Sequence, residues 1–241
     1  MAVPSRYEIG LSNGTSLLGA FCCLDGFSVS HIFAKAGFDF LVLDRQHAAY
    51  DWHELEQMCF RIRSEGTAVF VRTGSAAQQE IDLALDLPVE GIVIPNSSSF
   101  EEAKEAVSFT KYPPVGIRSV GNERHEAIRD VGKLGDPLVG MLIEHPGAVE
   151  AIDEIFSLDI DFAWVGTHDL AALMGMEPWD PETGEMPSEL AKALDRVKRS
   201  AAAHDIPFWQ PPGKGVPIGI ADVDARLVRQ AAEQAVAKWK S

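Results

Sequence analysis

Short apolar runs that stop at a reactive or turn-forming residue dominate this chain of 241 residues. FDFLVLD ends at Asp44, TAVFVR at Arg72, PLVGMLIE at Glu144 and DFAWVG at Gly166. Each run has the length and the branched side chains of a strand that is buried on both faces of a parallel sheet. The runs alternate with stretches of helical periodicity, and eight such runs predict an α/β fold, a (β/α)8 or TIM barrel.

The ends of these runs predict where the chemistry lies. In a TIM barrel the carboxyl ends of all strands meet at one rim, and that rim holds the active site. Polar residues that are far apart in the sequence are therefore expected to share one mouth, which indicates an enzyme. No linker, repeat or low-complexity segment interrupts the pattern, so we expect a single domain over residues 1–241.

The connection between the seventh and eighth runs breaks the alternation. Only residues 211–215 separate IPFWQ from VPIGIA. A helical crossover between parallel strands takes about a dozen residues or more. We therefore predict no α-helix between Gln210 and Val216, and a barrel that is open or distorted at this point.

Charge and composition exclude several classes of partner and location. The formal net charge is −15, which repels nucleic acid and anionic membranes. No apolar stretch reaches the roughly 18 residues of a membrane helix, and the first ten residues do not resemble a signal peptide. Cys22, Cys23 and Cys59 make a poor disulfide framework and indicate a reducing, cytoplasmic location, with the first two filling space in a strand.

Two acidic residues are the strongest candidates for a metal site. Glu144 ends the fifth run, and Asp169 follows the sixth. Two carboxylates together with water and an oxygen-rich substrate suit Mg²⁺ or Mn²⁺. Alternatively, Glu144 pairs with an arginine and Asp169 caps a short helix.

His47 is the candidate acid or base, because it follows the second strand and the histidine side chain ordinarily changes charge near neutral pH. Alternatively, it is a hydrogen-bonded histidine of the core. Asp44 would orient His47 or a water molecule, or would serve as a turn residue. Arg72 would hold an enolate or carboxylate oxygen, pair with Glu144 or Asp44, or do both. Arg118, in the rigid segment KYPPVGIRSVG, either lines the mouth or belongs to an ordinary turn.

Taken together, these segments resemble the metal-dependent (class II) pyruvate aldolases of the 4-hydroxy-2-oxoheptanedioate aldolase and citrate lyase beta-subunit superfamily. The resemblance extends from about Leu18 to Gly175 and more weakly over the last strand and helix. It implies a TIM barrel of the phosphoenolpyruvate/pyruvate-binding type. The motifs that support it are AGFDFLVLDRQHAAYD, the VR of AVFVRTG, VEGIVIPN, KYPPVGIRSVG, the IE of MLIEH, and WVGTHDLA.

The resemblance also implies roles for individual residues. Glu144 and Asp169 match the metal ligands, and His47 matches the catalytic base. Arg72 matches the residue that steadies the pyruvate enolate. Asp86 matches an aspartate that reaches into the neighbouring subunit's site near its histidine. Members of the family are typically hexamers, trimers of dimers, in which the last helix is exchanged between partners.

Three positions depart from the family pattern. Gln46 stands before the histidine, where the family often has Glu, although many relatives also have Gln there. Leu142 replaces a glutamine that contacts substrate, and it cannot donate a hydrogen bond. The usual Gly-Pro-x-Asp turn reads Gly166-Thr167-His168-Asp169, so His168 lies where a small residue is common. We expect Leu142 and the turn residues 166–168 to contact the substrate and to alter its identity.

The resulting hypothesis is a lyase that uses a divalent metal ion, Mg²⁺ or Mn²⁺ in preference to Co²⁺ or Zn²⁺. It would join a 2-oxo acid to an aldehyde through a pyruvate-type enolate, or reverse that reaction. An oxaloacetate decarboxylase, or a specialised enzyme of secondary metabolism that forms carbon–carbon bonds, would use the same residues. In another class, a degenerate barrel would act as a binding or assembly subunit. The expected partners are small molecules and further copies of the chain.

Overall fold

Eight parallel strands form a nearly closed barrel in the computed structural model, which describes residues 5–120, 123, 127 and 134–240. The strand order β7-β6-β5-β4-β3-β2-β1-β8 confirms the predicted (β/α)8 architecture. The strands are β1 (Leu17–Cys22), β2 (Phe40–Asp44), β3 (Ala68–Arg72), β4 (Gly91–Ile94), β5 (Leu138–Ile143), β6 (Phe162–Val165), β7 (Phe208–Trp209) and β8 (Ile218–Val223).

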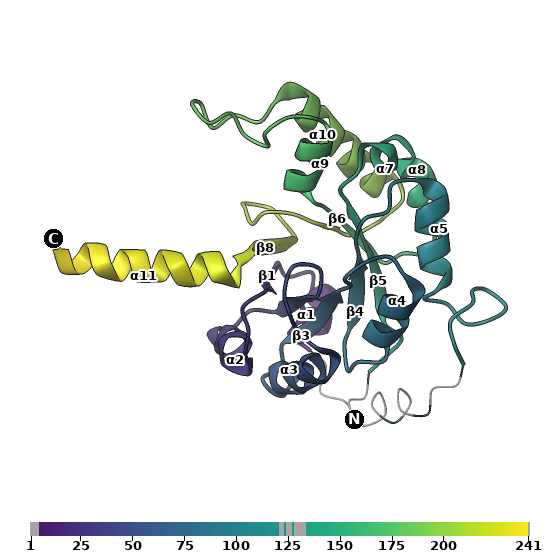
Figure 1. The fold of residues 1–241 in the computed structure, drawn as a ribbon, viewed down its shortest axis with the longest axis horizontal. Helices are drawn as coiled ribbons and strands as arrows, with labels where there is room; N and C mark the ends of the chain where they lie inside the picture. The colour runs from purple at the N-terminus through teal and green to yellow at the C-terminus, as the bar shows by residue number, and fades with distance from the viewer. Residues whose placement is uncertain (1–4, 121–122, 124–126, 128–133, 241) are drawn as a thin grey trace.

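The helices lie mostly outside the strands (Figure 1). They are α1 (Arg6–Asn13), α2 (Phe27–Ala36), α3 (Trp52–Ser64), α4 (Gln78–Leu85), α5 (Phe100–Ser108), α7 (Pro146–Glu150), α8 (Ile152–Ile155), α9 (Thr167–Leu173), α10 (Ser188–Ala203) and α11 (Asp224–Lys240). The helix expected after the fifth strand is divided at Ala151 into α7 and α8. Ser99 caps α5 by accepting a hydrogen bond from the backbone of Glu102.

The barrel closes between β7 and β8 through one isolated bridge. The Gln210 N–H donates to the Ile218 carbonyl at 3.2 Å, and the Gln210 carbonyl accepts from the Ile220 N–H at 2.9 Å. No helix lies between Gln210 and Val216, as predicted. The run IPFWQ forms a strand of only two residues, Phe208–Trp209. Because β7 is so short, the irregular segment between Gln210 and β8 can carry the chain back to the start of β8 without a helix.

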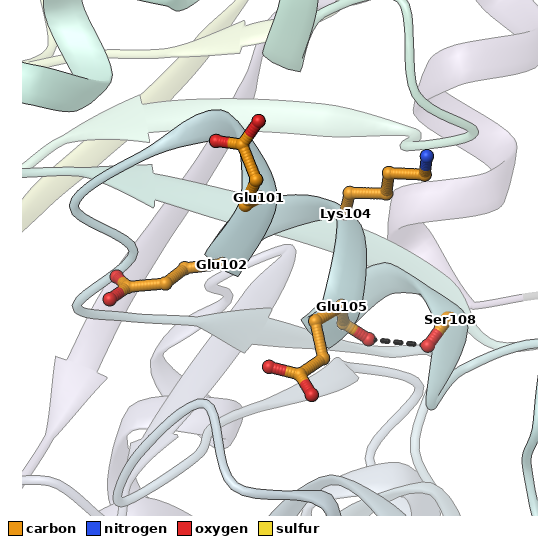
Figure 2. Close-up of a pocket in the computed structure, with 5 residues that line it drawn as sticks. All are labelled: Glu101, Glu102, Lys104, Glu105 and Ser108. Carbon is orange, nitrogen blue, oxygen red and sulfur yellow. Dashed lines mark hydrogen bonds between the residues drawn. The ribbon is translucent and has the colours of Figure 1, made fainter.

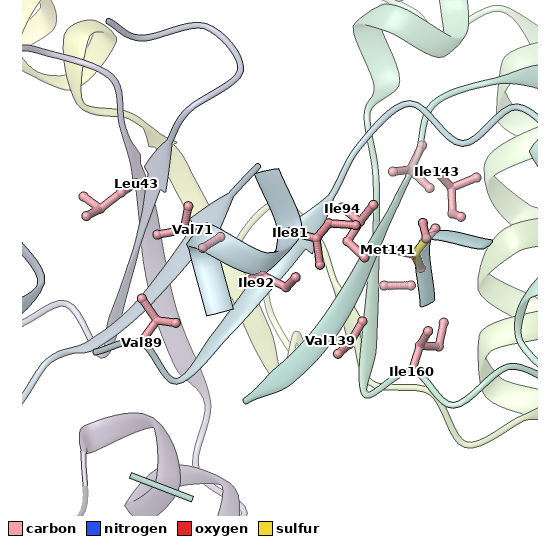
Figure 3. Close-up of a cluster of buried hydrophobic side chains, with 14 of the residues drawn as sticks. Leu43, Val71, Ile81, Val89, Ile92, Ile94, Val139, Met141, Ile143 and Ile160 are labelled. Carbon is pink, nitrogen blue, oxygen red and sulfur yellow. The ribbon is translucent and has the colours of Figure 1, made fainter. Parts of the chain in front are cut away.

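Two apolar layers hold the barrel together. Aromatic side chains fill its interior, where Phe162 and Trp209 stack with ring centroids 4.1 Å apart. Gly140 makes room for this stack, since a Cβ there would lie 2.1 Å from the Phe162 ring. A second layer of aliphatic side chains, including Ile92 and Met141, fills the space between the strands and the helices (Figure 3). This burial is the main stabilising contribution to the fold.

Helix α1 was not expected from the apolar runs. Its capping box is complete, since Ser5 accepts from the Glu8 N–H and the Glu8 carboxylate accepts from the Ser5 N–H at 2.8 Å. Tyr7 enters the interior aromatic cluster, with its ring centroid 5.1 Å from Phe70. Arg6 ties the helix to backbone carbonyls of Phe38 and Glu65. The helix therefore plugs the end of the barrel opposite the carboxyl ends of the strands.

Helix α11 extends away from the barrel as a single rod (Figure 1). Its first residue, Asp224, is buried, whereas every residue from Val228 to Lys240 is exposed. Among these, Val236 is 53% and Trp239 is 90% exposed. Within the described residues, no helix has the length and apolar content that crossing a membrane demands.

Candidate active site

The carboxyl ends of β2 and β3 bring Asp44 and Arg72 together at the mouth of the barrel. The guanidinium Nε donates to Asp44 Oδ1 at 2.8 Å, and Nη2 donates to Oδ2 at 2.6 Å. Both residues are buried, and Arg72 also lies over the ring of Phe21, 5.2 Å from its centroid. This bidentate pair fixes the guanidinium plane. The Nη1 nitrogen makes no hydrogen bond to the described part of the chain and remains available to an anionic oxygen.

Glu144 follows the end of β5 and is only 2% exposed. Its Oε1 atom accepts a hydrogen bond from the Asn96 N–H at 2.7 Å, whereas its Oε2 atom is buried and has no partner among the described residues. Burial raises the pKa of Glu144, and the charge of Asp169 raises it further. The hydrogen bond from the Asn96 N–H, the charge of Arg72 and the Gln46 side chain act in the opposite direction without cancelling the rise. A buried acceptor without a donor costs free energy unless a cation or a donor occupies the space beside it.

The surroundings of Glu144 fit a divalent cation. Asp169 is close enough for its charge to act on Glu144, and it is exposed at the start of α9. Gly166 leaves the space open, since a Cβ there would lie 2.8 Å from Glu144 Oε2. The side-chain oxygen of Gln46 is a second buried acceptor without a described partner. Hard oxygen ligands of this kind suit Mg²⁺ or Mn²⁺.

The described residues supply only a partial ligand set. They contain no group of three or more His, Cys, Asp or Glu side chains that could hold a metal ion. The two carboxylates would therefore need further oxygens from water or from a substrate, which is usual for Mg²⁺.

His47 lies in the segment that follows β2, and its side chain is exposed. Its backbone N–H donates to Asp44 Oδ1 at 3.4 Å, and the Gln46 N–H donates to the same oxygen at 3.0 Å. Within the described residues the imidazole has no hydrogen-bond partner. Asp44 therefore orients the backbone of this segment and the Arg72 guanidinium, and it does not contact the imidazole.

Leu142 belongs to an apolar layer directly beneath the polar one. It pairs with Trp164 in the register of β5 and β6, and the Trp164 ring contacts Phe21 across the barrel at 4.7 Å between centroids. The Cδ1 atom of Leu142 is 3.6 Å from the position of a Cβ on Gly166. The floor below Glu144 and Arg72 is therefore hydrocarbon, consistent with the absence of a glutamine at position 142.

Thr167 and His168 begin α9, directly before Asp169. The His168 side chain is exposed, and its ring meets the edge of Trp179, 5.1 Å between centroids. Thr167 is half-buried. The start of α9 thus places the His168 imidazole, packed against the Trp179 indole, next to Asp169.

Asp86 lies away from these groups, at the end of α4. Its Oδ1 atom accepts from Arg118 Nη2 at 3.3 Å. Arg118 is buried, and it also donates to the Leu85 carbonyl and lies over the Tyr112 ring. Arg118 therefore anchors its segment to the end of α4 and does not line the mouth of this subunit.

Asn96 is a site residue that the sequence did not single out. It follows β4, adopts a φ of 61°, and directs its N–H to Glu144. Asparagine tolerates this left-handed conformation better than most residues. The pair Pro95-Asn96 directly after a strand is a turn pattern that would have indicated an unusual backbone here.

An open surface hollow on α5 is separate from these residues (Figure 2). It is lined by side chains of that one helix: Glu101, Glu102, Lys104, Glu105 and Ser108. None of the site residues expected from the sequence contributes to it, and its acidic side chains are solvated.

Comparisons with known proteins agree with the fold. A family model described as HpcH/HpaI aldolase/citrate lyase matches residues 18–210. The hydroxypyruvate/pyruvate aldolase of Roseovarius nubinhibens is 28% identical over 100% of this chain and 98% of its own. That of Rhizorhabdus wittichii is 32% identical over 77% of this chain and 76% of its own. The crystal structure of an HpcH/HpaI aldolase from Desulfitobacterium hafniense superposes with a TM-score of 0.80 at 25% identity, covering 97% of this chain and 96% of that one.

Proposed function

Because the chain belongs to the HpcH/HpaI aldolase/citrate lyase family, we propose that it is a divalent-metal-dependent aldolase acting through a pyruvate-type enolate. Relatives that span most of its length are named as aldolases, which are carbon–carbon lyases, and two of them act on hydroxypyruvate or pyruvate by name. The proposed substrates are a 2-oxo acid and an aldehyde, or the aldol that they form.

One observation supports this function above the others. A buried carboxylate oxygen without a partner, Glu144 Oε2, shares the mouth with the Nη1 donor of Arg72, which is likewise unused. The first group suits a cation, and the second suits an oxyanion. A 2-oxo acid carries both a carboxylate and a carbonyl oxygen that becomes negative on enolisation, so it would use both groups at once.

Glu144 and Asp169 would hold the metal ion, with Mg²⁺ or Mn²⁺ favoured by the oxygen ligands and Co²⁺ or Zn²⁺ as substitutes. When bound, the ion supplies Lewis-acid stabilisation of negative charge on the carbonyl oxygen. The Nη1 group of Arg72 would donate a hydrogen bond to the same oxygen, while the ion pair with Asp44 keeps the guanidinium in place.

His47 would move the proton between the methyl carbon of the 2-oxo acid and water or the aldehyde oxygen. Its exposed imidazole at the mouth is free to act in either direction. Leu142, Gly166, Thr167 and His168 would contact the substrate. The apolar floor at Leu142 offers no donor to a hydroxyl or carboxylate substituent.

We propose that the protein assembles as a hexamer, a trimer of dimers, through α11. The apolar stripe that includes Val228, Val236 and Trp239 is exposed along a helix that contacts the barrel only near its start. An exposed stripe of this kind is typical of a helix that packs on another subunit. Asp86, 33% exposed in its side chain, would then lie near the His47 of a neighbour.

A substrate screen tests the proposal. Pyruvate, hydroxypyruvate, 2-oxobutyrate and oxaloacetate are incubated with short aldehydes, with Mn²⁺ or with EDTA, and products are identified by mass spectrometry. Metal-dependent aldol formation is the expected result. Carbon dioxide release from oxaloacetate without any aldol product would instead favour the decarboxylase, and inactivity with all donors would favour a degenerate barrel.

A further inference from the structure

Asp224, the first residue of α11, is fully buried and joins that helix to the segment after β1. Its Oδ1 atom accepts from the N–H groups of Cys23 at 3.0 Å and Ala225 at 2.7 Å, and from the Cys23 thiol at 3.3 Å. Its Oδ2 atom accepts from the Leu24 N–H at 3.2 Å. One carboxylate thus accepts hydrogen bonds from three backbone N–H groups. These bonds fix the start of α11 against the segment that follows β1.

The same segment is held from its other side by Tyr50. The Tyr50 hydroxyl donates to the Leu24 carbonyl at 2.7 Å, and the Tyr50 side chain is 1% exposed. Tyr50 follows His47 by three residues in the chain. Asp224 therefore binds the N–H of Leu24, and Tyr50 binds its carbonyl. Leu24 thereby links the start of α11 to the segment that contains His47.

This link lies at the level of the catalytic groups. The register of β1 and β2 pairs Phe21 with Val42 and Cys22 with Leu43, so Cys23 comes beside Asp44 at the mouth. Burial raises the pKa of Cys23 to about 11, and the hydrogen bond and charge of Asp224 and the charge of Asp44 add to the shift. Cys23 therefore stays a neutral thiol that donates to Asp224.

We propose that Asp224 is a positioning residue that couples the position of α11 on the barrel to the position of His47 at the mouth. The proposal rests on the proton-transfer role of His47 given above. The coupling passes through residues 23 and 24 and the Tyr50 hydroxyl, and it leaves Glu144 and Asp169 untouched. A shift of α11 would then change proton transfer without changing how the metal ion is held.

The test compares Asp224→Asn with Asp222→Asn. Asparagine has nearly the size of aspartate and keeps one oxygen that can accept from the backbone, but its amide nitrogen cannot accept, so it cannot serve all of the donors. Asp222 is a matched control, because among the described residues its carboxylate forms hydrogen bonds or ion pairs only with the Val223 N–H and Arg226, within its own segment. Tyr50→Phe removes the hydrogen bond to the Leu24 carbonyl and keeps the aromatic ring.

Four quantities are measured on the full-length protein. They are the rate of deuterium incorporation into the pyruvate methyl group, the KM for pyruvate, the Kd for Mn²⁺, and amide hydrogen exchange over residues 23–26 and 45–50. For Asp224→Asn and Tyr50→Phe we expect deuterium incorporation to slow at least tenfold. Amide exchange should rise in both segments, while the Kd and KM change less than twofold. Asp222→Asn should match the parent protein in all four.

Two results would overturn the coupling. The first is a deuterium incorporation rate within twofold of the parent in Asp224→Asn, and the second is amide exchange that rises at residues 23–26 but not at 45–50. If the parent protein itself incorporates no deuterium, the proposed function fails. Amide exchange then decides the positioning role alone, since that measurement requires no catalysis. If Asp224→Asn does not fold, Tyr50→Phe gives the same comparison.

Discussion

Arg72 and Asp44 form a bidentate ion pair between neighbouring strands, in which Nε and Nη2 bind the two oxygens of one carboxylate. The pair uses the edge of the guanidinium that faces β2 and leaves Nη1 directed elsewhere. Two readings of Arg72, a structural pairing and an oxyanion-binding role, are therefore compatible. Buried pairs of this kind contribute orientation more than net stability.

Asp44→Asn should lower kcat/KM for the aldol reaction about 100-fold. The amide nitrogen of asparagine cannot accept a hydrogen bond from the guanidinium, so the orientation of the Arg72 side chain is no longer fixed. Steady-state kinetics with pyruvate and an aldehyde measure the loss. Asp195→Asn is the control, since Asp195 pairs with Arg199 on the exposed surface of α10. Activity of Asp44→Asn within threefold of the parent would show that the pair does not orient Arg72.

Glu144→Gln should stabilise the metal-free protein by about 1 kcal/mol at pH 8 while abolishing activity, because it removes a buried charge with an unpaired oxygen. Burial raises the pKa of Glu144, so the folded parent takes up a proton more readily than the unfolded chain. The parent therefore gains stability relative to the variant as the pH falls toward the ordinary carboxyl range. Urea unfolding at pH 8 and pH 5 in EDTA measures both effects. A variant that is less stable than the parent at pH 8 would contradict the account.

Tyr7→Ala should destabilise the fold by about 3–5 kcal/mol, since it removes an aromatic ring from the closed end of the barrel. Tyr7→Phe keeps the ring and should cost much less. Thermal and urea unfolding followed by circular dichroism distinguish the two variants. Equal losses in both would mean that the hydroxyl, and not the ring, holds α1 in place.

Trp239→Ala combined with Val236→Ser should shift the protein from a hexamer to smaller species, because it removes the most exposed apolar groups of α11. Size-exclusion chromatography with light scattering gives the mass directly. Gln230→Ala, a change of a polar residue on the same helix, should leave the mass unchanged. A parent protein that is monomeric at micromolar concentration would refute the assembly.

The strands and most helices were predictable from the sequence because apolar runs and helical periodicity respond to burial, which the barrel supplies at regular intervals. The missing helix before β8 followed from chain length alone. Helix α1 was missed because its single buried aromatic, Tyr7, makes no apolar run, although the Ser5–Glu8 capping box marks its start.

The pairing of site residues was less predictable. Asp44 pairs with Arg72, and Glu144 accepts a hydrogen bond from the Asn96 N–H. Both pairings depend on how closely the ends of neighbouring strands approach each other at the rim. Periodicity places a residue on a strand end but does not select its partner. Asp86 illustrates the limit, since its contact with Arg118 joins segments 32 residues apart whose meeting depends on the whole barrel.

Deuterium incorporation into the methyl group of pyruvate is the most direct test of metal-dependent enolisation by Glu144, Asp169, Arg72 and His47. The rate is followed by NMR in heavy water with Mg²⁺, Mn²⁺ or EDTA, for the parent protein and for Glu144→Ala. We predict incorporation that requires either metal ion and disappears in the variant. Incorporation at the same rate in EDTA, or in Glu144→Ala, would contradict the account.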